Sequence, residues 1–229
     1  MNAKRQELER EVTIPVAHPF ILSAPRGSEG LPLLVALHGY AGDMTSMLRV
    51  AQAIAGDEIA VAAVQGPHQF WFPSVDQVST RKTGFGWLTD YRPEASQARH
   101  HRLVEGVIDA ACRELDADRR SVFVMGFSQA CALNYRFAFT RPGALRGVIG
   151  VCGGIPSDFA DAKYVEIPAA VLHVAAQDDE YYRPERTRPF ADALGRLSRD
   201  VTFREYPGPH VFPRAAIPFI RDWILDHCK

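Results

Sequence analysis

The chain has 229 residues, of which 47% are hydrophobic, and it carries 26 basic and 27 acidic side chains. This size and composition predict a substantial core, and we expect residues 1–229 to form a single α/β domain. The balanced charge, without a basic block, argues against nucleic acid as a partner. No apolar run is long enough to cross a bilayer, so no stable membrane insertion is expected.

The first residues and the cysteines predict a cytoplasmic location. Met1–Glu7 carries charges of both signs with no apolar stretch behind it, unlike a secretory signal. The four cysteines are scattered without metal-ligand spacing and are expected to be reduced thiols of the core. They are Cys112, Cys131, Cys152 and Cys228. His100 and His101 also lack a partner at metal-binding spacing, so no metal site is predicted.

Strand-like and helix-like stretches alternate through the first half of the chain. Strands are expected at Leu33–Leu37 and Ile59–Val64, with a helix at Thr45–Ala55 between them. A further helix is expected at Gln97–Leu115, where apolar residues recur on one face. This alternation continues to the C-terminus and predicts a mostly parallel sheet with helices on both faces.

The segment Gly66–Arg92 is long for a connection and has no clear periodicity. It is rich in aromatic residues, namely Phe70, Trp71, Phe72, Phe85, Trp87 and Tyr91. Loops of this length are usually functional or disordered, and the aromatic content argues against disorder. We therefore expect an ordered loop that roofs a binding site, with Trp71 and Trp87 in the pocket wall.

Ser128 stands at a predicted strand–turn–helix junction. The apolar strand Ser121–Met125 leads into Gly-Phe-Ser-Gln-Ala, and a helix is expected at Cys131–Phe139. A serine at the tip of such a turn holds its hydroxyl above the sheet, and the amide of Gln129 lies at the helix N-terminus, where it can bind an oxyanion. The alternative is that Ser128 is an ordinary helix N-cap.

The second half continues the same alternation. Strands are expected at Leu145–Val151, Ala169–Ala176 and Val201–Tyr206, with helices at about Glu185–Leu197 and after His210. The sequence does not fix the residue at which the last helix begins, because Pro213 and Pro218 cannot both lie in the first turn of one helix. The connection Cys152–Pro168 is too short for a cap domain, so we expect an open site.

A carboxylate and a histidine follow the serine in chain order. Asp178 and Asp179 leave the end of the Ala169–Ala176 strand, and His210 comes just after the last strand. A serine hydroxyl is a weak nucleophile that needs a histidine base and an acid to orient it, in this order in α/β-hydrolases. The residues alone leave both aspartates as candidates for the acid. His173 lies in the middle of a strand and is expected to be a hydrogen-bonded core residue.

A second oxyanion donor is predicted after the first buried strand. Leu33–Leu37 runs into His38-Gly39-Tyr40, where this fold takes the amide that complements the one after the serine. We therefore expect the amides of Tyr40 and Gln129 to bind the oxyanion, with His38 bracing the loop. Tyr182 is a further candidate for substrate binding.

With these motifs the chain resembles the α/β-hydrolase superfamily, and within it the phospholipase/carboxylesterase group of acyl-protein thioesterases and small bacterial esterases. The resemblance is carried by His38-Gly39-Tyr40, Gly126-Phe127-Ser128-Gln129, the late Asp-Glu pair and Gly208-Pro209-His210. Ala130 and Cys131 depart from the small, glycine-rich residues usual after the serine. Ala175-Ala176-Gln177 replaces the usual glycine-containing approach to the acid.

The resemblance implies an α/β-hydrolase fold and a serine carboxylesterase with Ser128, His210 and an aspartate as its triad. The family's Asp-Glu followed by two bulky residues aligns best on Asp179-Glu180-Tyr181-Tyr182, which favours Asp179. No cofactor is expected, and the substrate is a small-molecule ester or thioester. Rival hypotheses are a thioesterase or lysophospholipase with the same triad, and a non-catalytic binding protein on a hydrolase scaffold.

Overall fold

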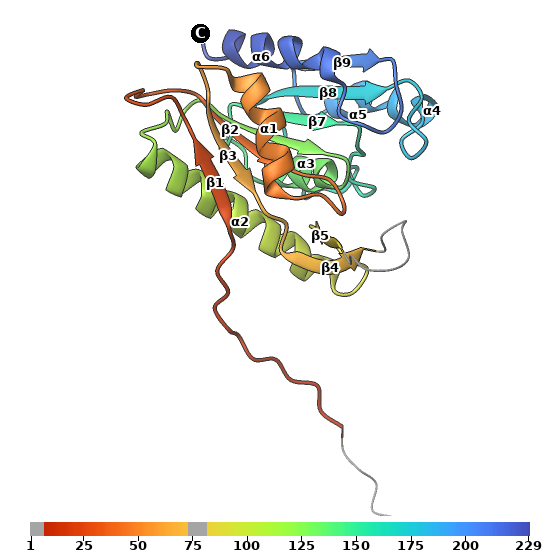
Figure 1. Ribbon diagram of the computed structural model, residues 1–229. Helices are drawn as coiled ribbons and strands as arrows, with labels where there is room; N and C mark the ends of the chain where they lie inside the picture. The colour runs from red at the N-terminus through yellow and green to blue at the C-terminus, as the bar shows by residue number, and fades with distance from the viewer. Residues whose placement is uncertain (1–6, 73–81) are drawn as a thin grey trace, which may run out of the picture.

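The computed structural model describes residues 7–72 and 82–229. Its main sheet has the strand order β1-β3-β2-β6-β7-β8-β9, in which β1 is antiparallel to β3 and every other pair is parallel. The strands are β1 (Phe20–Ser23), β2 (Leu33–Leu37), β3 (Ala60–Val64), β6 (Val122–Phe127), β7 (Gly147–Val151), β8 (Ala170–Ala176) and β9 (Val201–Tyr206). The predicted, mostly parallel sheet is therefore confirmed (Figure 1).

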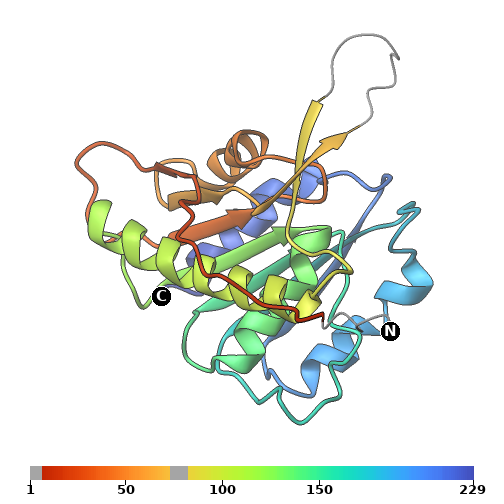
Figure 2. The ribbon, with the colours of Figure 1, turned by 90° about the horizontal axis from the view of Figure 1, so that it is seen from below.

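Helices cover both faces of this sheet because its buried strands are apolar on both sides. Leu34 and Ala36 of β2 pack in one core cluster with α1 (Met44–Ala55) and α6 (Ile217–Asp226). Leu33, Val35 and Leu37 of the same strand pack in the opposite cluster. That cluster includes α2 (Pro93–Glu114), α3 (Gln129–Thr140) and α5 (Phe190–Gly195). Figure 2 views the second face, with α2 lying across it.

The parallel register brings the carboxyl ends of the central strands to one edge of the sheet. Leu37 at the end of β2 lies beside Val64 of β3 and Gly126 of β6. Ala176 at the end of β8 lies beside Tyr206 at the end of β9. The segments that follow these strands therefore gather at the edge where open α/β sheets place their sites.

The predicted aromatic loop is in part a β-hairpin. β4 (His68–Phe72) pairs antiparallel with β5 (Lys82–Gly86), and the hairpin projects beyond the main sheet (Figures 1 and 2). The expected ordered loop is therefore partly regular structure, because β4 and β5 pair with each other in a two-stranded sheet that is separate from the main one. Residues 73–81 of the predicted loop lie outside the described residues.

Prolines account for the differences in helix boundaries. The helix expected at Glu185–Leu197 is two short helices, α4 (Pro184–Thr187) and α5, because Pro189 between them has no amide hydrogen to continue the first. α2 begins earlier than expected because Pro93 occupies its first turn. At the C-terminus a 3₁₀ turn, η1 (Arg214–Ala216), follows Pro213, while Pro218 lies in the first turn of α6.

The connection between β7 and β8 contains no helix, in agreement with the expected lack of a large cap. Within the described residues, no helix combines the length and the apolar character that crossing a membrane requires.

Candidate active site

Ser128 lies at the sharp turn between β6 and α3. Its backbone has φ 54° and ψ −113°, a conformation that costs a non-glycine residue about 1–3 kcal/mol. The turn is fixed by hydrogen bonds from the Ser128 amide to the Val151 carbonyl (2.9 Å) and from the Cys131 amide to the Ser128 carbonyl (3.1 Å). The Ser128 side chain makes no capping hydrogen bond to α3, which argues against the N-cap interpretation.

Ser128, His210 and Asp179 form a chain of hydrogen bonds. Ser128 Oγ lies 2.9 Å from His210 Nε2, and His210 Nδ1 lies 2.8 Å from Asp179 Oδ2. The other carboxylate oxygen, Oδ1, accepts from the amides of Tyr181 (2.9 Å) and Tyr182 (2.7 Å). Asp179 is buried, with no side-chain exposure, whereas 13% of the His210 side chain remains exposed. A buried carboxylate thus faces one imidazole nitrogen and a serine hydroxyl faces the other.

The residues on either side of Asp179 hold the segment that carries His210. The amide of Asp178 donates to the Gly208 carbonyl (2.9 Å), and Asp178 Oδ2 accepts from the Gly208 amide at 3.3 Å. Glu180 Oε2 accepts from the amide of His210 itself (3.1 Å). Asp178 therefore contacts the backbone and not the imidazole. Sequence reasoning did not anticipate the contact of Glu180, because no residue pattern signals a side chain that binds a loop amide.

Aromatic rings surround the imidazole of His210. The ring of Tyr182 stacks on it (centroids 5.8 Å apart), and that of Tyr181 meets it edge-on (4.9 Å). The ring of Phe127, which precedes the serine, lies 5.3 Å away on a tilted plane. Tyr182 is half-buried, and its partly exposed ring lies against the imidazole.

The segment after β2 lies directly against the serine. A Cβ atom on Gly39 would come within 2.9 Å of the Phe127 ring and 3.1 Å of Ser128 Cβ, so only glycine allows this approach. Ala41, in the left-handed region at φ 61°, donates to the carbonyl of Phe85 in β5 (2.9 Å). The Tyr40 ring is exposed and stacks on Phe70 of β4 (4.7 Å).

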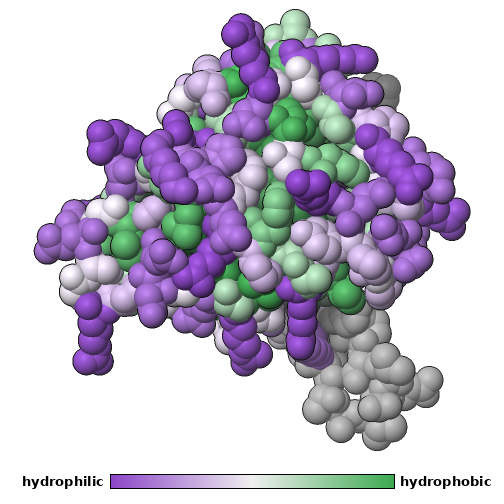
Figure 3. All heavy atoms as spheres, turned by 90° about the horizontal axis from the view of Figure 1, so that it is seen from above, coloured by the Kyte–Doolittle hydropathy of each residue, from purple (hydrophilic) through white to green (hydrophobic). Residues whose placement is uncertain are grey.

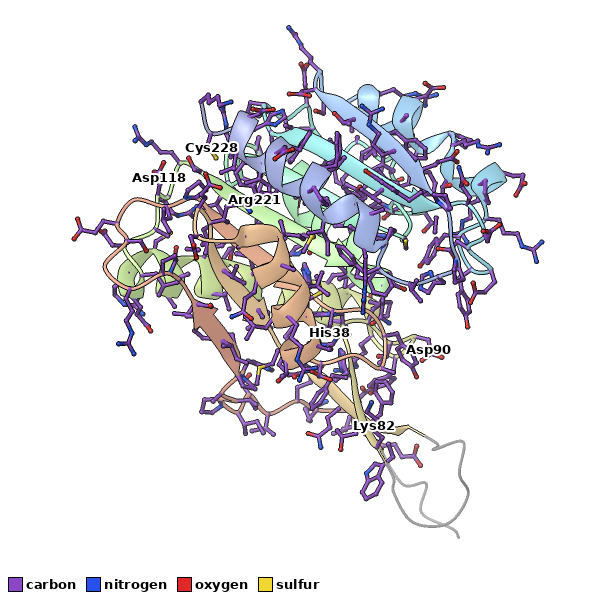
Figure 4. The ribbon with its side chains drawn as sticks, turned by 45° about the horizontal axis from the view of Figure 1, so that its top comes forward. His38, Lys82, Asp90, Asp118, Arg221 and Cys228 are labelled. Carbon is purple, nitrogen blue, oxygen red and sulfur yellow. The ribbon has the colours of Figure 1, made fainter. Side chains whose placement is uncertain are left out.

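His38 is a buried brace for this segment. Its Nε2 accepts from the Gly66 amide (2.9 Å) and lies 3.0 Å from the side-chain amide of Gln65, so Nδ1 carries the proton and donates to the Gly39 carbonyl at 2.7 Å. Burial lowers the pKa of His38 below its ordinary value of 6.5 and keeps the ring neutral. Figure 4 shows His38 beyond the end of β2, between α1 and the β4–β5 hairpin.

Gln129 and Trp87 join the serine turn to the segment after β5. Gln129 Oε1 accepts from the amide of Trp87 (2.9 Å), and Gln129 Nε2 donates to the carbonyl of Leu88 (3.1 Å). The Trp87 indole is fully buried and donates to the His38 carbonyl (2.7 Å). The prediction that Trp87 lines the pocket wall was wrong, because Trp87 has no exposed surface and packs in the core with its indole N–H on the His38 carbonyl. Trp71 is 68% exposed on β4.

The two sequence departures are accommodated by packing. The Cys131 thiol donates to the carbonyl of Gly126 (3.1 Å), and burial raises its pKa far above the ordinary value, so it remains a protonated core thiol. After β8, the Gln177 amide donates to the carbonyl of Tyr206 (2.9 Å). This bond holds the approach to the acid against β9 without a glycine.

His173 is a core residue with one hydrogen-bonded nitrogen. Its Nδ1 lies 2.8 Å from the Tyr135 hydroxyl, and its ring stacks on Phe203 (5.6 Å). Among the described residues, Nε2 has no hydrogen-bond partner, so the expectation of a hydrogen-bonded core histidine holds for one nitrogen. Burial lowers its pKa from 6.5 to about 4.

A serine turn at the carboxyl edge of a mostly parallel sheet, with an acid after β8 and a histidine after β9, defines an α/β-hydrolase fold. Residues 24–227 match the sequence profile of the family described as Phospholipase/Carboxylesterase, and the chain belongs to this family. The predicted resemblance is confirmed, and the chain is a member of a family of ester hydrolases.

Individual relatives are distant. The chain is 28% identical over 195 residues to "Putative esterase NocK" of Nocardia uniformis subsp. tsuyamanensis, covering 82% of this chain and half the length of that protein. A carboxylesterase from Bacillus cereus superposes with a TM-score of 0.71 at 17% identity, over 92% of this chain and 94% of the other. A carboxylesterase from Mesorhizobium loti gives 0.71 at 20% identity, over 91% and 94%. At these identities the structural likeness establishes the fold.

Proposed function

We propose that the protein is a serine carboxylesterase that cleaves small-molecule esters through an acyl-enzyme intermediate. The observation that carries this proposal is the hydrogen-bonded chain from Ser128 through His210 to the buried Asp179. A strained serine whose hydroxyl faces an imidazole, and does not cap its helix, is the arrangement that nucleophilic catalysis requires. Membership of an ester hydrolase family supports the same reaction.

In the proposed mechanism His210 Nε2 takes the hydroxyl proton as Ser128 Oγ attacks the ester carbonyl. Asp179 accepts from Nδ1–H, which fixes the tautomer that leaves Nε2 free to act as a base. The imidazolium then gives its proton to the leaving alcohol. Water attacks the acyl-enzyme by the same route, and the acid is released with Ser128 restored.

The developing oxyanion would be bound by the amides of Tyr40 and Gln129. Gln129 begins α3, so its amide lies at a helix N-terminus, where the helix dipole favours negative charge. The Tyr40 amide belongs to the segment that Gly39 brings against Ser128 and that His38 and Trp87 hold in place. Tyr182, and Trp71 on the hairpin, stay proposed substrate contacts.

The test is hydrolysis of p-nitrophenyl acetate and butyrate, and of the corresponding thioesters, by the purified protein and by Ser128→Ala. Loss of the nucleophile should lower turnover by about a million-fold. Ser157→Ala, at an exposed position of the β7–β8 connection, is the matched control and should retain full activity. An active Ser128→Ala variant, or an inactive wild-type protein, would refute the proposal, and faster thioester cleavage would favour a thioesterase.

A further inference from the structure

A small cavity lies next to Phe127, the residue before Ser128, on the face of the sheet covered by α1. Its volume is about 190 Å³. The walls are mainly apolar and are formed by Tyr40, Met47, Val50, Phe127 and Phe212. None of the residues that line it carries a charged side chain, since His38 is kept neutral by burial. Figure 3 views the face that carries α1 and α6, where hydrophobic residues form a band among hydrophilic ones.

Residues of the cavity wall adjoin the proposed reacting groups. Phe127 is bonded directly to Ser128, and its ring contacts both the imidazole of His210 (5.3 Å) and the ring of Phe212 (6.1 Å). Phe212 follows His210 by two residues, and Tyr40 carries the proposed oxyanion amide. The cavity therefore lies between the segment that carries the proposed base and the segment that carries the proposed oxyanion donor.

We propose that this cavity binds the hydrocarbon part of the leaving alcohol. The inference rests on the proposed function, because only in an ester cleavage does His210 protonate a leaving oxygen. That oxygen must lie within hydrogen-bond reach of Nε2, so the carbon chain attached to it begins beside His210. The apolar surface next to His210 on the α1 side is that of Phe127 and Phe212, which form the cavity wall.

The volume of the cavity limits the length of the alcohol chain that it can hold. Binding sites for drug-sized molecules have volumes of roughly 300–1,000 Å³, which this cavity does not reach. At about 30 Å³ per water in the liquid, it has room for about six water-sized groups, or a chain of a few carbons. Each buried methylene should raise kcat/KM about four-fold, the change that corresponds to about 0.8 kcal/mol. The gain should end near butyl.

The test measures kcat/KM for two series of esters by titration of the released acid. The first varies the alcohol from methyl to hexyl acetate, and the second varies the acid from ethyl acetate to ethyl hexanoate. The second-order constant reports acylation, in which the alcohol is still attached. For the wild-type protein the alcohol series should rise to butyl and then level off.

Two substitutions on α1 change the cavity in opposite directions. Val50→Trp should fill it and flatten the alcohol series, without changing the slope of the acyl series. Met47→Ala should deepen it and move the plateau to longer alcohols. Val165→Trp, in the half-exposed connection next to the end of α3, is the matched control and should change neither series. Circular dichroism checks that each variant is folded.

Different failures can be told apart. If Val50→Trp flattens the acyl series, the cavity binds the acyl group and the inference is overturned. If both α1 variants leave both series unchanged, the cavity is not a substrate site. Failure of the proposed function gives a different result, namely no hydrolysis of any ester by the wild-type protein or full activity in Ser128→Ala.

Discussion

The two sides of Ser128 are built from different parts of the chain. On the His210 side, carboxylate side chains accept the hydrogen bonds: Asp179 accepts from the imidazole, and Asp178 and Glu180 accept from the backbone that carries it. On the Tyr40 side the proposed donors are backbone amides, and the side chains of His38 and Trp87 act only by holding that backbone. Substitutions on the first side should therefore remove a chemical group, whereas those on the second should displace a backbone segment.

Among substitutions on the two sides of Ser128, the largest effect is expected for Asp179→Asn. The amide cannot stabilise the imidazolium and favours the wrong tautomer of His210, so turnover should fall by roughly 10⁴-fold. Asp178→Asn is the matched control, because Asp178 hydrogen-bonds to the backbone of Gly208 and not to the imidazole, and it should cost less than ten-fold. Turnover of p-nitrophenyl butyrate by both variants checks the difference. A larger loss of turnover in Asp178→Asn than in Asp179→Asn would show that Asp178, and not Asp179, is the acid.

A smaller loss is expected when the backbone side is displaced. Gly39→Ala places a Cβ 2.9 Å from the Phe127 ring, so the segment that carries Tyr40 must move. Weakening one oxyanion donor costs up to about 10²-fold in kcat. Gly106→Ala on α2, where a Cβ meets nothing within 4 Å, should leave kcat unchanged and stabilise the helix by about 1 kcal/mol. Equal turnover in Gly39→Ala and Gly106→Ala would show that the Tyr40 amide does not take part in the mechanism.

Glu180→Ala should have an effect of ten-fold or less. Glu180 is exposed and accepts a single bond from the His210 amide, so its loss loosens the position of the base without removing a reacting group. The fall should be in kcat, with KM nearly constant, and Glu180→Gln should restore turnover because the amide oxygen can accept the same bond. Glu185→Ala on α4 serves as the control. If Glu180→Ala keeps the wild-type kcat, Glu180 does not help to position His210.

His173→Phe should leave catalysis unchanged, lower the stability of the fold at every pH by leaving the buried Tyr135 hydroxyl without this partner, and change how stability depends on acid pH. His173 has a pKa of about 4 when folded and 6.5 when unfolded, so the unfolded chain binds more protons between these values. Stability is therefore lost as the pH falls from 6.5 towards 4, by about 1.4 kcal/mol per pH unit for this residue. Urea unfolding at pH 7, 5.5 and 4.5 should show a shallower decline in the variant. An altered pH profile of kcat/KM at pH 5–8 would link His173 to the site.

Sequence reasoning predicted the fold and the central residues of the site because both depend on local patterns. The buried strands are continuous apolar runs, and Ser128 follows one of them in a turn with small residues on either side. The choice between Asp178 and Asp179 could not be made from the residues alone. Adjacent loop residues point in different directions, and only the hydrogen bonds from the Tyr181 and Tyr182 amides fix which carboxylate faces His210.

The aromatic residues were the least predictable part. Trp71 and Trp87 lie in the same segment, yet one indole is 68% exposed and the other is fully buried. Burial of a tryptophan side chain is favourable where its indole N–H has a hydrogen-bond acceptor. The acceptor of Trp87 is the His38 carbonyl, which is distant in the sequence. The pairing of β4 with β5 and the split at Pro189 likewise depend on tertiary packing and on a single missing amide.

The central claim is that Ser128 is a nucleophile activated by His210 and Asp179, and covalent labelling tests it most directly. The protein is treated with a fluorophosphonate probe, and the modified residue is located by mass spectrometry of its peptides, with labelling rates for the wild type, Ser128→Ala and Asp179→Asn. We expect one label, on Ser128, absent in Ser128→Ala and formed far more slowly in Asp179→Asn. A label on another residue, or equal rates in the wild type and Asp179→Asn, would contradict this account.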